Sequence, residues 1–487
     1  MPPAEIYVLG LLMTVSLCSE ECVNMLNDYL TGLKSSFTGY TELRAQLNSR
    51  FVMNIGDGNT DESFTSSGGV CARVLKNGVY GLASSSDYST KEALYVLRAA
   101  EKNAEMMGKY AKKHVAEIPD MQSRDLPLNY AIQDIDKGFI KAMLEDLYSY
   151  AARKYPDVKI MVSAENKSSE KLLVVHSGAS GRSNNVLGVI NINMTKVSED
   201  GDETSAYETM GIDRYFNDLF HNNSELHELV DKTYSNLIKN IAEDKDKVTI
   251  EGGFYDVILS PEFTGMLAHE AVGHTCEADV VVRKDSVCAA NMGKQVASEL
   301  VSLTDFAQSA YGERCPIEML FDDEGSVCMD APIIKDGILI GCMTNRDTAV
   351  RLGVLCTGNA RASEYSDEPI IRMRNTCFLK GTSKLGDMIA SINHGYYLTR
   401  SGGGNGSLKG EFNMVVSEGY EINHGRLGKK INPTLTSGLA WDALKTVSMV
   451  SDNFEDPKNC GVCGKKQSIP TSQGGPSMKL NLSISGK

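Results

Sequence analysis

Two histidines and a glutamate stand within six consecutive residues near the middle of the chain, at His269, Glu270 and His274. Imidazole nitrogen binds zinc well, and a carboxylate beside the metal can take a proton from water. On a regular α-helix the five-residue spacing turns the histidines about 140° apart, so they cannot bind one ion. Gly273 precedes the second histidine, and we expect the helix to end there or to widen into a π-turn. The apolar stretch 263–268 predicts a buried helix that holds the site.

Two histidines leave a catalytic zinc site incomplete, because such sites usually have three protein ligands and one open position. The nearby candidates for a third ligand are Cys276, Glu277 and Asp279, and the distant candidates are Cys460 and Cys463, a C-x-x-C pair. This pair lacks the strand and helix of a thioredoxin-like motif, and the sequence has no second close pair for a four-cysteine zinc site. The alternative is that the two histidines bind no metal and are unrelated surface or core residues. The chain contains only 8 histidines, so two of them so close together favour a metal site.

The overall composition is that of a globular, acidic protein. The chain has 487 residues, with 49 Lys and Arg against 63 Asp and Glu, and a net charge of −14. Such a charge does not attract phosphate backbones, so we expect no nucleic-acid partner. An apolar fraction of 42% and a charged fraction of 23% exclude a disordered chain, a collagen-like fibre and a coiled coil.

Cysteine usage and the amino terminus bear on where the protein works. Most of the 12 Cys stand singly, which is typical of reduced thiols in a cytoplasmic protein. The apolar run Ile6–Leu17 has the size of a signal-peptide core and is too short to span a membrane. No Lys or Arg precedes Lys34, and Glu5 stands where a positive charge would be needed. We therefore expect a cytoplasmic protein without a membrane segment.

The first half of the chain alternates between groups of strands and groups of helices. An amphipathic helix is expected from about Glu20, running into a strand by Asn48. Asn77-Gly78 between apolar runs predicts a hairpin. The other expected strands are Glu42–Asn54, Gly68–Leu75, Val79–Ser84, Val158–Ala164, Lys171–His176 and Asn185–Asn193, and the helices are Thr90–His114, Ile132–Lys154 and Ser224–Ala242.

The second half differs in texture, with many short strand-like runs between glycine-rich turns. Helices are expected only around Pro261–His274 and Leu303–Ser309. The fold class is therefore predicted as α+β in two domains, because helices and hairpins form separate groups. The expected divisions are an extension over 1–19, an amino-terminal domain of helices with an antiparallel sheet over 20–250, and a strand-rich antiparallel domain carrying the metal site over 251–487.

Several motifs together resemble the TldD/PmbA family, described as metalloproteases and formerly as modulators of DNA gyrase. HEAVGHTCEAD, from His269 to Asp279, is similar to the H-E-x-x-x-H signature of the family. The later motifs follow in family order: FDDEG (321–325), DGILIGCMTNRDTA (336–349), TGNAR (357–361), PIIRMRNT (369–376), GYEINHGRLG (419–428) and CGKKQSIPTSQGGP (463–476). YTELR (40–44) and RVLKNGVYGLAS (73–84) resemble the family more loosely. The resemblance runs from about residue 20 to the end of the chain.

The resemblance implies a Zn²⁺ ion held by His269, His274 and Cys463, with Glu270 as the general base. All four positions are present, which implies the TldD-type branch rather than the paralogue PmbA, also called TldE, which has lost the metal motif. The implied activity is hydrolysis of unfolded or extended peptides. The implied assembly is a homodimer or a complex with a PmbA/TldE-like paralogue. One departure is Lys466, where the family pattern usually has Gly.

Other residues carry open alternatives. Arg361, Arg372 and Asn375 could bind a peptide backbone or terminus, and FDDEG could form a second carboxylate cluster near the metal; the alternative for each is a turn with solvated or paired charges. Gly402–Gly406 lacks phosphate-loop spacing and is expected to be a flexible loop near the active site. The rival to a peptidase is a non-enzymatic binding protein with a structural zinc site.

Overall fold

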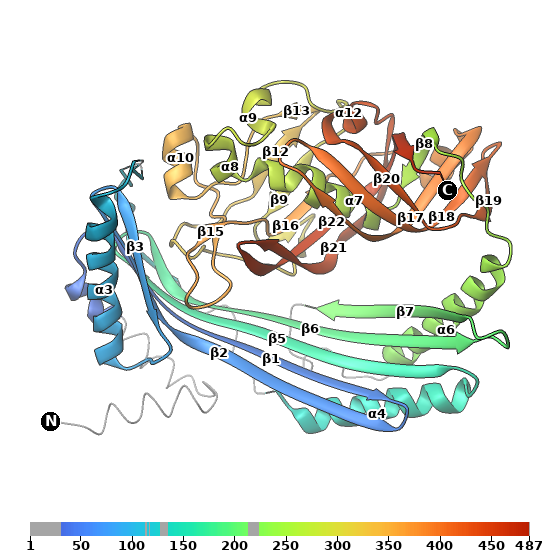
Figure 1. Ribbon diagram of the computed structural model, residues 1–487, viewed down its shortest axis with the longest axis horizontal. Coiled ribbons are helices and arrows are strands. Elements are labelled where there is room, and N and C mark those ends of the chain that lie inside the picture. Colours follow the sequence, from blue (N-terminus) through green and yellow to red (C-terminus); the bar gives the residue numbers. More distant parts are fainter. Residues whose placement is uncertain (1–30, 113, 116, 127–134, 213–223, 487) are drawn as a thin grey trace. The chain divides into compact units, whose positions relative to one another are not determined.

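The structure is a computed structural model that describes residues 31–486, except 113, 116, 127–134, 213–223 and the side chains of 212 and 455–460. The expected extension 1–19 and the start of the helix expected from Glu20 lie outside the described residues. The α+β class is confirmed, and the chain forms two compact units (Figure 1). The first contains the chain up to Asn240 with Phe321–Val327 and Arg361–Ile370, and the second contains the remainder from Ile241. The sequence predicts a single domain boundary at residue 250. In the structure two segments from beyond that boundary also belong to the first unit.

A seven-stranded sheet forms the frame of the first unit (Figure 1). The strands are β1 (Thr41–Gly56), β2 (Asn59–Lys76), β3 (Val79–Ser85), β4 (Arg124–Leu126), β5 (Lys159–Val175), β6 (Ala179–Val197) and β7 (Glu203–Ile212). They are ordered β3-β2-β1-β5-β6-β4, with β7 also pairing β6. All pairs are antiparallel except β4 with β6.

The hairpin expected at Asn77-Gly78 is confirmed, because Lys76 pairs with Val79 and both turn residues have positive φ angles of 54° and 73°. The expectation of two separate strands over Val158–Ala164 and Lys171–His176 is wrong. Both belong to the single long strand β5, because its polar middle is paired to β1 on one side and to β6 on the other. Backbone pairing on both sides replaces the turn that the polar residues suggested.

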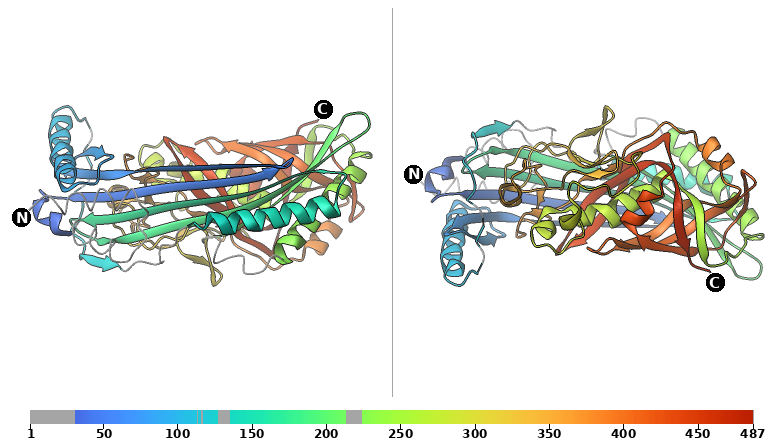
Figure 2. Two further views of the ribbon diagram at one scale, coloured as in Figure 1. Left: turned by 90° about the horizontal axis from the view of Figure 1, so that it is seen from below. Right: turned by 90° about the horizontal axis from the view of Figure 1, so that it is seen from above.

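The helices of the first unit are η1 (Leu33–Ser36), α3 (Thr90–Gly108), α4 (Lys137–Lys154) and α6 (Ser224–Asp244). Ser89 and Asp136 begin α3 and α4 by accepting hydrogen bonds from backbone N–H groups of the first turn. α3 packs on β2 and β3 with apolar residues at helical spacing, namely Ala93, Val96, Leu97, Ala100 and Ala104. α4 packs on β1 and β5, and Figure 2 shows it lying along the strands.

The two segments from the second half are held in the first unit by buried ion pairs and hydrogen bonds. Nζ of Lys171 lies 2.7 Å from a carboxylate oxygen of Asp323, and Nη2 of Arg73 lies 2.6 Å from Glu324. Arg44 donates to three backbone carbonyl groups within 364–367. The acidic residues of FDDEG are therefore paired in the first unit, which supports the paired-charge alternative for this motif.

The second unit is built on an eleven-stranded sheet and a few short ribbons. Its strands are β8 (Gly253–Leu259), β9 (Leu303–Phe306), β10 (Ser309–Ala310), β11 (Glu313–Arg314), β12 (Ala331–Lys335), β13 (Ile338–Leu339), β16 (Asn375–Phe378), β17 (His394–Gly406), β18 (Glu411–Asn423), β19 (Arg426–Lys430), β20 (Thr434–Leu439), β21 (Met449–Lys465) and β22 (Gln467–Ile484). The two-residue strands β14 (Ala360–Arg361) and β15 (Ile370–Ile371) each contribute one residue to either unit. Pairing of β22 with both β20 and β8 closes β8, β17, β18, β20 and β22 into a ring. Most pairs are antiparallel, as expected, but β16–β22 and β17–β8 are parallel.

The helices of the second unit are short: α7 (Pro261–Leu267), α8 (Ala278–Val282), α9 (Cys288–Asn291), α10 (Arg346–Leu352), α11 (Leu385–Ala390) and α12 (Ala440–Lys445), with the turns η2 (Ala268–Val272) and η3 (Gly273–Cys276). The helix expected over Leu303–Ser309 is wrong, because β9 pairs with β12 and β16 there. The flexible loop expected at Gly402–Gly406 is also wrong, because these residues form the end of β17.

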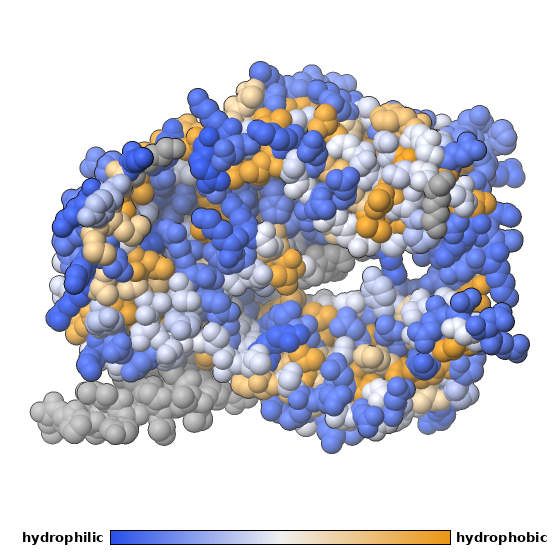
Figure 3. Space-filling view, in the orientation of Figure 1, coloured by the Kyte–Doolittle hydropathy of each residue, from blue (hydrophilic) through white to orange (hydrophobic). Residues whose placement is uncertain are grey.

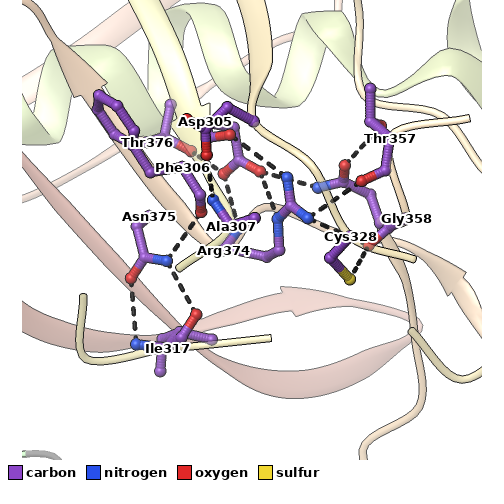
Figure 4. Close-up of polar contacts among 12 residues, drawn as sticks. Asp305, Phe306, Ala307, Ile317, Cys328, Thr357, Gly358, Arg374, Asn375 and Thr376 are labelled. Atoms are coloured by element: carbon purple, nitrogen blue, oxygen red, sulfur yellow. Dashed lines mark hydrogen bonds and ion pairs between the residues drawn. The ribbon is translucent and has the colours of Figure 1, made fainter. Parts of the chain in front are cut away.

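A buried arginine organises the strands beside the ring. Arg374 is fully buried, and its guanidinium binds the carboxylate of Asp305 on β9 at 2.9 Å and the backbone carbonyl groups of Met329, Thr357 and Gly358 (Figure 4). Asn375 next to it binds the backbone of Phe306 and Ile317. The PIIRMRNT motif thus contributes side chains that replace missing backbone pairing between short strands.

On the face drawn in Figure 3, hydrophilic side chains cover most of the area and apolar ones occur in small separate groups. No helix in the described part of the chain is both long and apolar enough to cross a membrane.

Candidate metal centre

The histidine motif follows directly after α7 and lies on the two unlike turns η2 and η3. Ser260 caps α7 by accepting a hydrogen bond from the backbone N–H of Phe263, and Pro261 is its first residue. The next turn, η2, is a π-turn, in which the N–H of Gly273 donates to the carbonyl of Ala268 five residues earlier. A π-turn brings residues at i and i+5 onto one face. The structure thus contains the π-turn expected from the spacing of the two histidines.

Gly273 serves this turn through its missing side chain. Its φ of −52° and ψ of −53° are ordinary helical values, so the positive-φ freedom of glycine is not used. A Cβ atom at this position would stand 2.1 Å from Sδ of Met373 and 3.2 Å from the carbonyl oxygen of Ala268. The glycine therefore lets the backbone between the histidines lie against a fully buried methionine.

Two further close approaches fix the motif against the surrounding strands. A Cβ atom on Gly406, the last residue of β17, would stand 1.9 Å from the carbonyl oxygen of Glu270. A Cβ atom on Gly265 of α7 would stand 3.0 Å from the backbone nitrogen of Gly474 on β22. The hydroxyl of Thr264 donates to the carbonyl of Pro476 at 2.8 Å. The Gly-Gly-Pro ending of the tail motif is thus the surface on which the helix before the histidines packs.

The tail also brings Cys463 to the histidines. β21 and β22 form a hairpin, and Sγ of Cys463 near its turn lies 3.2 Å from Nε2 of His274. The ligand atoms of His269, His274 and Cys463 all lie within 4.8 Å of one another, and all three residues come from the second unit. The rings of the two histidines are nearly perpendicular, with their centroids 5.0 Å apart.

This group of side chains fits a zinc ion. With Zn–N bonds near 2.0 Å and a Zn–S bond near 2.3 Å, donor atoms on one tetrahedral ion stand roughly 3.3–3.7 Å apart. The Sγ–Nε2 distance is close to that range. Nδ1 of His269 is buried and has no hydrogen-bond partner among the described residues. Two imidazoles and one thiol are donor groups that zinc prefers, and one of the imidazoles has a buried nitrogen without a described partner.

The surroundings shift the pKa values of the two imidazoles in opposite directions. Burial, the neighbouring His274 and the cation of Arg372 lower the pKa of His269 to about 3, so this ring is neutral and able to donate a lone pair. Burial also acts to lower the pKa of His274, but the contacts with Cys463 and Glu277 outweigh it and raise the pKa to about 10. In the metal-free protein the second imidazole therefore carries a proton beside the thiol.

Glu270 stands between the two histidines in the sequence, and its side chain is partly buried. Burial raises its pKa above the ordinary value, and attraction to His274 only partly opposes this. A carboxylate with a raised pKa holds a proton more readily than an exposed one, which suits a group that must accept a proton and pass it on.

The nearby candidates for a third ligand are engaged in contacts with other residues. Cys276 is fully buried, and its Sγ lies 2.8 Å from Sγ of Cys288. Glu277 and Asp279 both accept hydrogen bonds from Nζ of Lys465, at 2.7 Å and 2.8 Å. Of the described candidates, Cys463 is therefore the one placed with the histidines, and the side chain of Cys460 lies outside the described residues.

The three polar residues singled out in the sequence as possible peptide-binding groups have different surroundings. Arg361 belongs to the first unit and Asn375 to the strand contacts of Figure 4. Arg372 is fully buried and binds the backbone of Cys463 and Gln467, so it contacts the β21–β22 hairpin rather than an open surface. The sequence analysis missed this role and that of Lys465. The only signal for these two residues in the sequence is that they lie in the motifs PIIRMRNT and CGKKQSIPTSQGGP.

The chain was compared with known protein families and curated proteins. The family model for the PmbA/TldA metallopeptidase C-terminal domain matches residues 252–486. The zinc metalloprotease TldD homolog of Saccharolobus solfataricus is 30% identical over 361 residues, which cover 73% of this chain and 76% of that protein. The chain belongs to the PmbA/TldD family. All four residues of the candidate centre fall within the matched domain.

Further PmbA/TldD relatives match over different lengths. The metalloprotease TldD homolog of Buchnera aphidicola is 37% identical over 237 residues, which cover 48% of each chain. The match likewise spans 48% of the length of the TldD homolog of Haemophilus influenzae. A metalloprotease of Methanocaldococcus jannaschii is 29% identical over 465 residues, covering 92% of this chain and 97% of that protein.

Solved structures show that the PmbA/TldD fold extends through the chain. TldE from Thermococcus kodakarensis has a TM-score of 0.70 at 17% identity, and the match covers 95% of this chain and 100% of that one. A protein from Thermotoga maritima described as a modulator of a DNA gyrase has a TM-score of 0.71 at 19% identity, with the same coverage. At these identities the similarity concerns the fold alone.

Proposed function

We propose that this protein is a zinc-dependent peptidase that hydrolyses peptide bonds in unfolded or extended chains. His269, His274 and Cys463 would hold the metal, and Glu270 would act as the general base. The names of the relatives give metalloprotease activity, and in one case zinc, for those proteins. The centre described above is the reason to extend that chemistry to this chain.

The convergence of two imidazoles and one thiol carries the proposal. Their ligand atoms lie within 4.8 Å of one another, although Cys463 and His274 are 189 positions apart in the chain. Among the described residues this group holds three ligands. A tetrahedral ion held by three protein ligands keeps one position for water or for a substrate carbonyl, which is the arrangement of catalytic rather than structural zinc.

Each side chain then has a defined task. Zinc bound at this centre supplies Lewis-acid chemistry, which makes water more acidic and polarises a peptide carbonyl. His269 stays neutral because burial disfavours its charged form. Glu270 accepts a proton from the attacking water and delivers it to the leaving amine, so that one carboxylate serves both steps.

The decisive experiment separates metal binding from hydrolysis. Glu270→Gln keeps the size of the side chain but removes the base, so zinc content should stay that of the native protein. Hydrolysis of an unfolded protein such as casein should fall by roughly 10²–10⁴-fold. Chelation should abolish the activity of the native protein, and added zinc should restore it.

Full peptidase activity in Glu270→Gln would overturn the proposal. A native protein that binds zinc stoichiometrically, unfolds on chelation and hydrolyses no peptide would instead indicate a non-enzymatic binding protein with structural zinc. The two results differ in the native protein itself, so they do not depend on how well the variant folds.

We also propose that the protein works in the cytoplasm, as a homodimer or with a PmbA/TldE-like paralogue. The nine cysteines whose side chains are described form no disulfide among the described residues, which fits a reducing compartment. Light scattering after size exclusion, on the chain alone and mixed with such a paralogue, would measure the assembly. Peptidase assays on the same fractions would show whether the chain is active without the paralogue.

A further inference from the structure

The outward side of the hairpin turn that carries Cys463 is exposed, whereas Cys463 itself is buried. β21 and β22 join through Lys466, and Cys463 lies opposite Ile469 three residues from that turn. Gly461 and Gly464 stand on either side of the cysteine, and the space beside both α-carbons is open. These glycines leave the outward side of the turn without packing, so the position of the buried Cys463 depends on the contacts that the hairpin makes on its inward side.

Arg372 makes such contacts with both strands of the hairpin. One terminal nitrogen, Nη2, donates to the carbonyl of Cys463 at 2.6 Å, and Nη1 donates to the carbonyl of Gln467 at 2.8 Å. The guanidinium is planar and forked, so a single side chain reaches both acceptors without losing geometry. Hydrogen bonds from a charged donor are also stronger than neutral ones. The arginine thus bridges the two strands on either side of the turn.

Arg372 is itself held firmly. It is fully buried, and its backbone N–H donates to the carbonyl of Asn359 at 2.9 Å. The side-chain amide of Asn359 donates to the carbonyl of Arg372 at 3.0 Å and to the carboxylate of Asp305 at 2.8 Å. The TGNAR motif therefore supports the PIIRMRNT motif, and the strands of Figure 4 support both.

A second contact ties the turn to the histidine side of the centre. Nζ of Lys465 donates to Glu277 at 2.7 Å, to Asp279 at 2.8 Å and to the carbonyl of Ile371 at 3.3 Å. Glu277 follows His274 closely in the chain, and its carboxylate lies 3.9 Å from Nδ1 of that ring. Lys465 therefore links the cysteine hairpin to the segment that bears the second histidine.

We propose that Arg372 is a positioning residue that clamps the β21–β22 hairpin so that the thiol of Cys463 faces His274, with Lys465 as a second tether. This inference deepens the proposed function and rests on it, since it takes Cys463 as a metal ligand. A ligand on a loose hairpin would have to be ordered at each binding event, whereas a clamped thiol is already in place. Residues that orient metal ligands raise metal affinity for this reason.

The test uses the full chain with Arg372→Gln and Arg372→Lys. In the metal-free protein, the rate at which iodoacetamide alkylates Cys463, followed by peptide mass spectrometry, should rise about tenfold in Arg372→Gln because local opening becomes easier. The dissociation constant for zinc should rise by roughly 10–100-fold. Arg372→Lys keeps the charge and one donor, so both effects should be intermediate.

Arg374→Gln provides a matched control. This arginine is also fully buried and stands two residues further along, but it binds Asp305 and backbone carbonyl groups outside the hairpin. Its loss should lower stability, but it should raise the alkylation of Cys463 and the dissociation constant for zinc much less than Arg372→Gln does, because Arg374 reaches Arg372 only through Asp305 and Asn359. Cys356, a partly exposed cysteine outside the centre, serves as the internal reference for reagent reactivity.

Native alkylation and native zinc affinity in folded Arg372→Gln would overturn the clamp. If that variant does not fold, Arg372→Lys and Lys465→Met decide, because Lys465 is partly exposed at the hairpin turn and its loss disturbs little packing. Unchanged alkylation in both would equally overturn it. Failure of the proposed function looks different: the native protein would not bind zinc, or Cys463→Ala would bind it as tightly, whereas the metal-free alkylation rates would still report on the clamp.

Discussion

The thiol of Cys463 lies 3.2 Å from Nε2 of His274, although 189 positions separate the two residues in the chain. The other ring nitrogen, Nδ1, faces the carboxylate of Glu277 at 3.9 Å. One imidazole thus stands between a thiol and a carboxylate, and that carboxylate is bound to Lys465 on the cysteine hairpin. Carboxylates in this position orient metal-binding histidines, so the ring is prepared to present one nitrogen to an ion.

Removing the thiol should reduce metal binding without unfolding the protein. We expect Cys463→Ala to lose most of its zinc at metal concentrations that saturate the native protein, because a two-histidine site lacks the third ligand. Atomic absorption after gel filtration measures the zinc content, and Cys356→Ala is the matched control. Native zinc content in Cys463→Ala would show that another residue completes the site.

Adding one carbon at Gly273 should disturb the turn between the histidines. A Cβ atom there meets Sδ of the buried Met373, so Gly273→Ala should lower the free energy of unfolding by about 1–3 kcal/mol and reduce zinc affinity. Chemical unfolding and zinc titration measure the two effects. The double variant with Met373→Val should recover part of both, and a single variant indistinguishable from the native protein would contradict the steric explanation.

Acid should weaken the first unit through Asp323. Burial acts to raise its pKa, but Lys171 and Arg44 outweigh this and hold it below the ordinary 3.8. A carboxyl group whose pKa is lower in the folded state stabilises the fold above its unfolded pKa and loses that effect as the pH falls through its folded pKa.

Asp323→Asn should accordingly cost roughly 3–5 kcal/mol near neutral pH, because it leaves the buried Lys171 without its carboxylate. Its stability should also vary less with pH than that of the native protein over the acid range. Urea unfolding from about pH 3 to pH 7 tests both statements. Parallel pH curves for the two proteins would assign the acid sensitivity to other groups.

The hairpin turn should tolerate glycine better than its native lysine. Lys466 has a φ of 60°, a left-handed conformation that is unfavourable for residues with a side chain. Lys466→Gly should therefore raise the free energy of unfolding by about 0.5–1 kcal/mol, after allowing for the greater freedom of glycine in the unfolded chain. Lys466→Ala removes the charge but keeps Cβ, and equal stability of the two variants would show that charge rather than conformation matters.

Local patterns accounted for much of what was predicted correctly. The Asn77-Gly78 turn, the helix Ser224–Ala242 and the widened turn before His274 each depend on residues within a few positions of one another. The positive φ angle of Lys466 is also a local feature, and it accounts for the glycine that the family pattern usually has at this position. The errors arose where distant partners decided the outcome, as at the polar middle of β5, which neighbouring strands pair on both sides.

The sequence by itself determined that two imidazoles and a carboxylate would share one interrupted helix, since backbone geometry over six residues decides that. The choice of Cys463 as the third ligand came from resemblance to a family, whereas the chemistry of the residues alone left Cys276 and Glu277, which follow the histidines in sequence, as open candidates. Only the tertiary structure decided that Cys276 packs against Cys288, that Glu277 binds Lys465 and that Arg372 clamps the hairpin. These contacts join segments separated by tens to hundreds of residues, and such pairings follow from how the strands close around a common core rather than from any local spacing.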